Sequence, residues 1–153
     1  MLTMKWFFGD KDDLKDAHII RREVFMEEQG VSEADELDGT DDACIHLVIY
    51  DEGEKPVATG RIMVTLDDFI IGRVATVKSH RGQGLGRGVM EALIESCVIM
   101  GGERQTLHSQ THARGFYEKL GFTAYGDEFD DAGIPHIAME RFGGKVCCGK
   151  LVE

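Results

Sequence analysis

The apolar residues of this chain change their spacing from one segment to the next, and each spacing predicts a different element. Apolar residues recur at helical intervals between Asp12 or Asp13, either of which can cap a helix, and Gly30, which can end one. The next segment, 31–42 (VSEADELDGTDD), is acidic and has no period. We therefore expect a helix followed by a long loop, and long loops in compact domains are often functional.

Strands dominate the middle of the chain. Segments 43–51, 56–66 and 69–77 are rich in β-forming residues and are joined by short turns, which is typical of an antiparallel meander. The later periodicity predicts a helix over 84–100, a strand over 105–109, a helix over 111–120 and two strands over 122–129 and 134–142. This order predicts one mixed α/β, or α+β, domain over residues 1–142 around a single sheet, followed by a glycine- and cysteine-containing tail, 143–153.

Four glycines occupy alternate positions where the predicted helix 84–100 begins, in the segment SHRGQGLGRGVMEALIESC (79–97). Their spacing fits neither the P-loop pattern GxxxxGK[ST] nor, in either frame, the dinucleotide pattern GxGxxG. The pattern that remains is Arg81-x-x-Gly84-x-Gly86. Glycines let a backbone approach a ligand closely, and the free N–H groups of a first helical turn attract anions. The loop therefore predicts a site for an anion such as a pyrophosphate.

This loop resembles the acetyl-CoA motif of the GNAT superfamily of N-acetyltransferases, R/Q-x-x-G-x-G/A, and a second segment strengthens the resemblance. QTHARGFYEKLGF (110–122) is similar to the N-x-x-A-x-x-x-Y-E-K-L-G-F segment of the family, with Gln110 in place of Asn. The segment that starts RREVFMEEQ at residue 21 resembles the YjcF/ElaA-like branch. The resemblance implies the GNAT fold, a mostly antiparallel twisted sheet of about six to seven strands flanked by helices. Acyl-CoA would lie in a cleft between two splayed strands.

The resemblance also implies acetyl-CoA as co-substrate and assigns residues to it. The strand that ends at Val77 would pair with the pantetheine arm, and the loop that follows would hold the pyrophosphate. The residues assigned to the cofactor are Ala75, Thr76, Val77, Arg81, Gly82, Gln83, Gly84, Leu85, Gly86, Arg87, Gly88, Gln110, Phe116 and Tyr117. Tyr117 falls on the tyrosine that often protonates the departing CoA thiolate in this family; without the motif it would be interpreted as a core aromatic residue.

A proton acceptor is expected because an amine of pKa about 10.4 must lose its proton before it attacks. Glu28 is the first candidate, since it ends the first predicted helix, where acceptor pockets form in the family; Glu27 and Asp38 are rivals. The acidic stretch 27–42 is either a solvated face or a surface that favours a cationic amine, such as a polyamine, an amino sugar or a lysine-bearing peptide. Arg73, inside an apolar strand, needs an anionic partner, either an acidic loop residue or a substrate carboxylate.

Composition narrows the class of protein. The formal net charge of −11 argues against a nucleic-acid binder, because phosphate contacts need a basic surface. No apolar run approaches the length that spans a bilayer, and the N-terminus lacks a signal-peptide pattern, so we expect a cytoplasmic protein. The four cysteines lack zinc-site spacing, so no metal is expected.

The resemblance makes a homodimer an expectation. Two alternatives to the N-acetyltransferase stay open: an acyltransferase like the acyl-homoserine-lactone synthases, and a non-catalytic acyl-CoA sensor.

Overall fold

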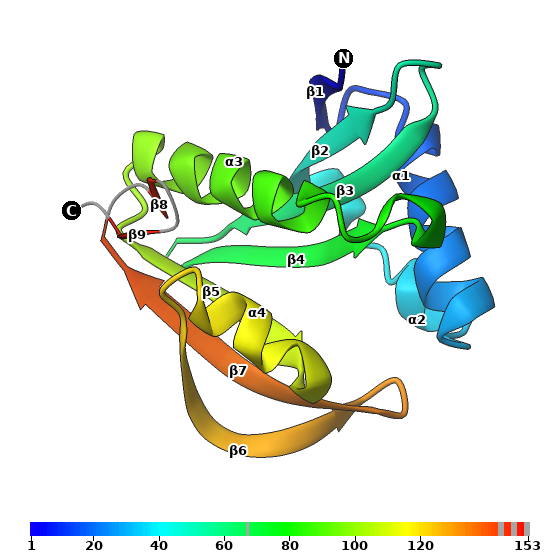
Figure 1. The fold of residues 1–153 in the computed structure, drawn as a ribbon. Helices are drawn as coiled ribbons and strands as arrows, with labels where there is room; N and C mark the ends of the chain where they lie inside the picture. The colour runs from blue at the N-terminus through cyan, green and yellow to red at the C-terminus, as the bar shows by residue number, and fades with distance from the viewer. Residues whose placement is uncertain (67, 144–145, 148–149, 152–153) are drawn as a thin grey trace.

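The computed structural model describes residues 1–66, 68–143, 146–147 and 150–151. Within these residues, one sheet has seven strands in the order β1-β2-β3-β4-β5-β7-β6 (Figure 1). The strands are, in that order, β1 (Thr3–Phe8), β2 (Cys44–Tyr50), β3 (Pro56–Val64), β4 (Phe69–Thr76), β5 (Arg104–Gln110), β7 (Ile134–Phe142) and β6 (Thr123–Asp131). In the tail, β8 (Val146–Cys147) pairs with β9 (Lys150–Leu151). The predicted mixed α/β fold around one sheet is confirmed.

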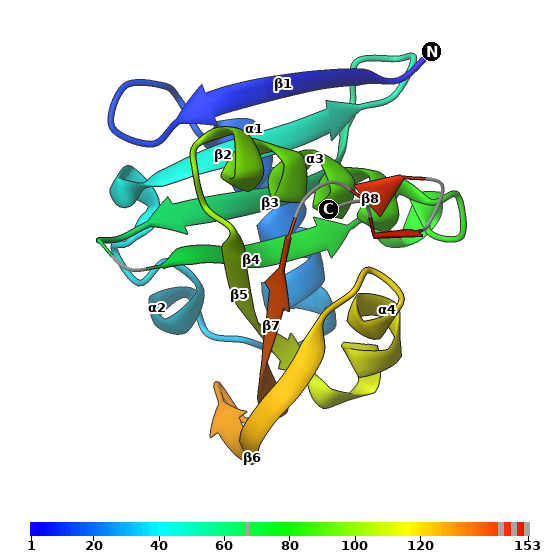
Figure 2. The same cartoon turned by 90° about the vertical axis from the view of Figure 1, so that its left-hand side faces the viewer.

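Helices cover both faces of this sheet, as Figure 2 shows. On one face, α1 (Lys15–Arg21) runs directly into a π-helix, η1 (Arg22–Glu28), and α1 packs on β3. On the opposite face, α3 (Leu85–Ile99) packs on β3 and β4. The shorter elements are α2 (Glu33–Glu36), α4 (Arg114–Glu118) and the 3-10 turns η2 (Asp41–Ala43), η3 (Lys78–His80) and η4 (Thr111–Ala113).

The hydrophobic core lies between α3 and the sheet and continues between α1 and the sheet. The apolar stripe of α3 is fully buried, as are Ala17 and Ile20 of α1. Gly60 of β3 explains how closely α3 approaches: a Cβ atom there would stand 2.7 Å from Leu93 and 2.8 Å from Val89. Glycine at this position is therefore required for packing rather than for a turn.

The sheet opens between β4 and β5, its parallel pair. These strands pair over two positions only, Phe69 with Gln105 and Ile70 with Thr106. Beyond them, residues 71–76 of β4 and 107–110 of β5 are not paired with each other, so the strands diverge toward their C-terminal ends (Figure 1). β5 instead pairs along its whole length with β7. This is the splay between two strands that the resemblance implied.

Two local predictions are wrong, and one strand was not predicted. The N-terminal residues form the edge strand β1, which the pattern missed because its alternate side chains Met4, Trp6 and Phe8 are exposed and give no buried periodicity. The first helix is not uniformly α-helical, since its second half is the π-helix η1. The acidic segment expected to be a loop contains α2, whose N-cap Ser32 accepts a hydrogen bond from the Asp35 amide at 3.1 Å.

Candidate active site

The glycine loop predicted to bind an anion surrounds a cavity at the N-terminus of α3. Gly82 and Gly84 have φ of 80° and 78°, left-handed conformations that side-chain-bearing residues adopt at a cost. Gly84 is also the N-cap of α3, so the free N–H groups of the first helical turn start here. The cavity measures about 180 Å³ and is lined by Thr76, His80, Arg81, Gly82, Gly84, Leu85, Gly86, Arg87 and Phe116.

Arg87, which lines this cavity, has an unused donor. Its Nε donates to Glu91 Oε1 at 2.7 Å. Its Nη2 is buried and has no hydrogen-bond partner among the residues that the structure describes. A buried guanidinium N–H without a partner is costly, and an anion in the cavity would supply the missing acceptor. The free N–H groups at the start of α3 and the Arg87 guanidinium therefore suit an anion such as a pyrophosphate.

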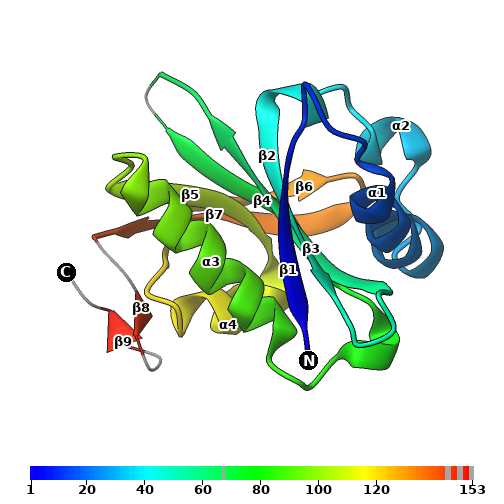
Figure 3. The same cartoon turned by 90° about the horizontal axis from the view of Figure 1, so that it is seen from above.

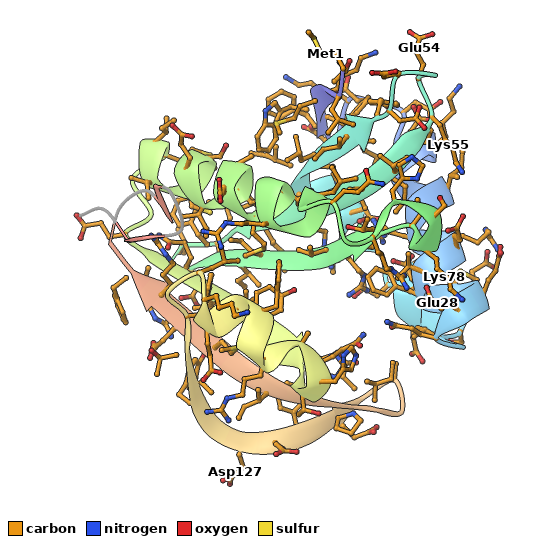
Figure 4. The ribbon with its side chains drawn as sticks, in the orientation of Figure 1. Met1, Glu28, Glu54, Lys55, Lys78 and Asp127 are labelled. Atoms are coloured by element: carbon orange, nitrogen blue, oxygen red, sulfur yellow. The ribbon has the colours of Figure 1, made fainter. Side chains whose placement is uncertain are left out.

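Arg81, the first residue of the motif, is engaged within the protein. Its Nε donates to the Thr76 carbonyl at 3.0 Å, and Nη1 and Nη2 donate to the two Glu28 carboxylate oxygens at 2.6 and 2.5 Å. In Figure 4, Glu28 lies beside Lys78 at the end of the helix formed by α1 and η1. Hydrogen bonds from Arg81 lower the pKa of the Glu28 carboxyl. The carboxylate predicted to be the base is thus an ion-pair partner of the predicted cofactor loop.

Tyr117 lies in a small aromatic cluster on α4. Its ring meets Phe116 edge-on at 5.0 Å and Phe122 at 6.1 Å between centroids. Burial raises the pKa of the phenol to about 12. Phe116 links this cluster to the cavity, since its ring comes within 3.5 Å of a Cβ built on Gly86. Phe116 therefore lies between Tyr117 and the glycine loop. The raised pKa keeps the Tyr117 phenol protonated at neutral pH.

Gln110 ends β5 and faces the end of η1. Its Nε2 donates to Gln29 Oε1 at 2.8 Å, and Gln29 Nε2 lies 3.4 Å from Gln110 Oε1. His112 Nε2 is 2.6 Å from the same Gln110 oxygen. Sequence reasoning assigned Gln110 to the cofactor but gave Gln29 no role. The signal for Gln29 was present, because it is the last residue of the RREVFMEEQ segment.

Arginines neutralise much of the acidic stretch before β2. Arg21, which is buried, pairs with Glu36 at 2.6 Å and with Asp41 at 2.7 Å, and Arg61 pairs with the same Asp41 oxygen at 2.8 Å. His46 is also buried, and its Nε2 donates to the Asp41 carbonyl at 3.1 Å. These carboxylates hold the segment to the sheet, so they are not free to attract a cationic acceptor.

Of the two partners expected for Arg73, the structure shows the acidic loop residue: Arg73 pairs with acidic residues of segment 31–42. Its Nε donates to Glu36 Oε1 at 3.2 Å, and Nη2 donates to the Glu36 carbonyl at 3.0 Å. Arg73 itself has φ of 50° in a bulge of β4, where the pairing register with β3 shifts around Gly60. Its ion pairs therefore anchor α2 to the bulge at the start of the splay.

The other residues assigned to the cofactor do not all lie at the loop cavity. Ala75 and Val77 have buried side chains, so only their backbones could contact a cofactor. Gln83 lines a neighbouring cavity of about 300 Å³ with Met1, Leu2, Asp51, Glu52 and His80, and not the cavity at the loop. Gly88 is inside the first turn of α3, where its N–H donates to the Gly84 carbonyl at 3.0 Å. The structure thus brings Thr76, the loop and Phe116 together.

A splayed parallel strand pair beside a glycine-rich helix N-terminus defines an acyltransferase that uses an acyl-CoA. The family model described as "Acetyltransferase (GNAT) domain" matches residues 12–141 of this chain. The chain belongs to the GNAT acetyltransferase family, as its motifs predicted, and it is an acyltransferase enzyme.

Similar proteins agree with this assignment. The chain is 42% identical over 132 residues to YyaT of Bacillus subtilis, covering 84% of this chain and 88% of the relative. It is 40% identical over 133 residues to the N-acetyltransferase YjcF of the same organism, covering 86% and 94%. The crystal structure of Escherichia coli ElaA superposes with a TM-score of 0.83 at 27% identity, covering 92% of this chain and 99% of that one. The predicted YjcF/ElaA-like branch is confirmed.

The described residues contain neither a membrane-spanning helix nor a cluster of metal ligands. Among the helices in the described part of the chain, none is long and apolar enough to cross a membrane. The same part of the chain contains no group of three or more His, Cys, Asp or Glu side chains placed to hold a metal ion. Cys148, the neighbour of Cys147 in the C-terminal tail, lies outside the described residues.

Proposed function

We propose that this protein is an acetyl-CoA-dependent N-acetyltransferase that transfers the acetyl group to a primary amine of a small molecule or peptide. The observation that supports it best is the cavity at the N-terminus of α3, where the left-handed Gly84 and the unpartnered Nη2 of Arg87 suit a pyrophosphate. The open end of the splay lies beside this cavity, since Thr76 at the end of β4 lines it. A pantetheine arm would lie between these strands.

The chemistry proposed is direct attack of the amine on the thioester carbonyl, without an acyl-enzyme. Acetyl-CoA supplies the activated acyl group. Among residues 74–76, the backbone N–H groups that point away from β3 would pair with the arm and polarise the carbonyl, whereas the Val77 N–H already donates to the Val57 carbonyl at 2.9 Å. Tyr117 would protonate the departing thiolate; its pKa of about 12 keeps the phenol protonated across the neutral range.

Glu28 stays the proposed proton acceptor, with a constraint that follows from its ion pair. Because Arg81 lowers its pKa, the carboxylate is ionised throughout the neutral range and is a weaker base than a free glutamate. Glu28 would therefore act by orienting the amine or a water molecule as well as by accepting a proton. Replacing it, as Glu28→Gln, should change the pH–rate profile; an unchanged profile would exclude it as the base.

The proposed class of acceptor rests on the acidic stretch 27–42. A cationic amine is still our proposal, supported now by the carboxylates outside the arginine network, such as the exposed Glu27, rather than by the whole stretch. A cytoplasmic location and a homodimer remain predictions. The alternatives of a lactone-type synthase and a non-catalytic sensor are not favoured, because the family model is an acetyltransferase domain and the relative YjcF is described as an N-acetyltransferase.

Calorimetry with acetyl-CoA tests the loop assignment. Wild-type protein should bind acetyl-CoA, and Gly84→Glu should abolish binding, because the added carboxylate repels the pyrophosphate and the left-handed backbone resists a side chain. Equal affinity of the two proteins would show that the pyrophosphate is not held at this loop.

A further inference from the structure

The end of the π-helix η1 is attached to both diverging strands. Glu28 bonds to Arg81, which is itself anchored on the carbonyl of Thr76 at the end of β4. The next residue, Gln29, pairs with Gln110 at the end of β5. Two consecutive residues therefore bridge the two sides of the splay at its open end.

Backbone hydrogen bonds define the turn that carries Glu28 and Gln29. The Gln29 N–H donates to the Val24 carbonyl at 3.1 Å, the five-residue step of a π-helix, and the Val31 N–H donates to the Phe25 carbonyl at 2.8 Å. Gly30 then turns the chain with φ of 75°. π-Helical turns are rare and frequently occur at functional sites, which makes the end of η1 a candidate for a role beyond packing.

The helical segment that carries the bridge and the loop cavity lie on opposite faces of the sheet, and Arg81 belongs both to the bridge and to the lining of the cavity. The cavity includes Phe116 of α4 and the start of α3, on the face that α3 covers. η1 continues from α1 on the other face (Figures 1 and 3). If the pyrophosphate occupies the cavity, as the proposed function requires, an arm that passes between the strands points its acyl end at Gln29 and Gln110.

We propose that the Gln29–Gln110 amide pair closes the acyl end of this passage and restricts the donor to short acyl groups such as acetyl and propionyl. Both side chains are partly buried, and each amide is satisfied by the other or by His112. A longer acyl chain would have to displace the pair, leaving partly buried amide groups without partners beside an apolar chain. This inference rests on the proposed function and adds the acyl-chain preference to it.

Binding of CoA, acetyl-CoA and hexanoyl-CoA tests the inference without knowledge of the amine. Dissociation constants are measured by calorimetry for the wild type, Gln29→Ala and Gln29→Glu, after thermal melts show that each variant folds. Gln29→Ala opens the passage. Gln29→Glu is the matched control, because it keeps the side-chain length and still accepts from Gln110 Nε2.

We expect the wild type and Gln29→Glu to bind acetyl-CoA at least about tenfold more tightly than hexanoyl-CoA, and Gln29→Ala to lose that preference. Equal affinity of the wild type for the two acyl-CoAs would overturn the inference, as would a preference that Gln29→Ala leaves unchanged or that Gln29→Glu also loses. Failure of the wild type to bind CoA itself would overturn the proposed function, and the inference with it.

Discussion

The ion pair between Arg21 and Glu36 gives the sharpest prediction about stability. The two side chains are 1% and 3% exposed, and Glu36 accepts from Arg21 Nε at 2.6 Å, from Arg21 Nη2 at 3.1 Å and from Arg73 Nε at 3.2 Å. Glu36→Ala removes all three of these contacts and leaves the buried Arg21 guanidinium with Asp41 as its carboxylate partner and the carbonyl of residue 36 as a further acceptor. Breaking a buried ion pair on one side costs about 3–5 kcal/mol. For a chain of this length that corresponds to a fall in Tm of roughly 6–20 °C.

A second ion pair between the same parts of the chain provides the control. Arg22 and Glu33 lie 2.9 Å apart but are 52% and 62% exposed, so Glu33→Ala should cost less than about 1 kcal/mol. Urea unfolding followed by circular dichroism at neutral pH measures both variants. If the losses in the free energy of unfolding caused by Glu36→Ala and Glu33→Ala differ by less than about 1 kcal/mol, burial does not determine the strength of these ion pairs and the reasoning is refuted.

Three further predictions concern catalysis, the loop and acid stability. Tyr117→Phe should lower kcat by about a hundredfold with little change in the KM for acetyl-CoA, measured by CoA release; unchanged kcat would remove the tyrosine as acid. Gly84→Ala should lower the free energy of unfolding by roughly 1 kcal/mol, because the φ of Gly84 is 78°. Gly88→Ala should raise the free energy of unfolding by a similar amount, roughly 1 kcal/mol, because Gly88 lies within the helix and its Cβ would stand in open space. Urea melts in which the two changes have the same sign would contradict this prediction. Partial burial opposes ionisation of Asp41, but hydrogen bonds from Arg21 and other donors lower its pKa below the usual range. Its stabilising effect is therefore present above about pH 4 and lost as the pH falls further, so Asp41→Asn should lower Tm at pH 7 more than at pH 3; an equal loss at both would exclude this linkage.

The sheet core and the glycine loop were predictable because local patterns specify them. The strands that became β2, β3 and β4 are apolar over nearly their whole length, as buried strands are, and their bounds agree with the structure to within two residues. The loop was predictable because a helix that begins with alternate glycines is locally unfavourable unless a ligand or a turn requires it. Gly84 shows the turn directly, through its left-handed φ.

The partners of the site residues were not predictable, because they depend on contacts between distant parts of the chain. Glu28 and Arg81 are 53 residues apart, and Gln29 and Gln110 are 81 apart. Neither pair leaves a periodic signal in the sequence. The acidic stretch before β2 had the same limitation. Its composition suggested a surface for a cation, while Arg21 pairs with two of its carboxylates, which lie 15 and 20 residues further along the chain.

Strand β1 shows a different limit. An edge strand pairs on one side only, and its exposed side chains need not be polar. In TMKWFF the apolar residues at alternate positions face outward, and Phe7 packs against the core, so the pattern gave no reliable indication of which face is buried. The antiparallel register with β2, from Thr3 with Tyr50 to Phe8 with Ile45, is what specifies the strand.

The most direct test of the central claim is an acetylation screen that follows CoA release and acetylated product by mass spectrometry. Wild-type protein is incubated with acetyl-CoA and each member of a panel of polyamines, amino sugars and lysine-bearing peptides. We predict release of CoA that requires both acetyl-CoA and an amine, with one acetyl group found on the amine nitrogen. Binding of acetyl-CoA with no amine-dependent release across the panel would contradict the proposed N-acetyltransferase.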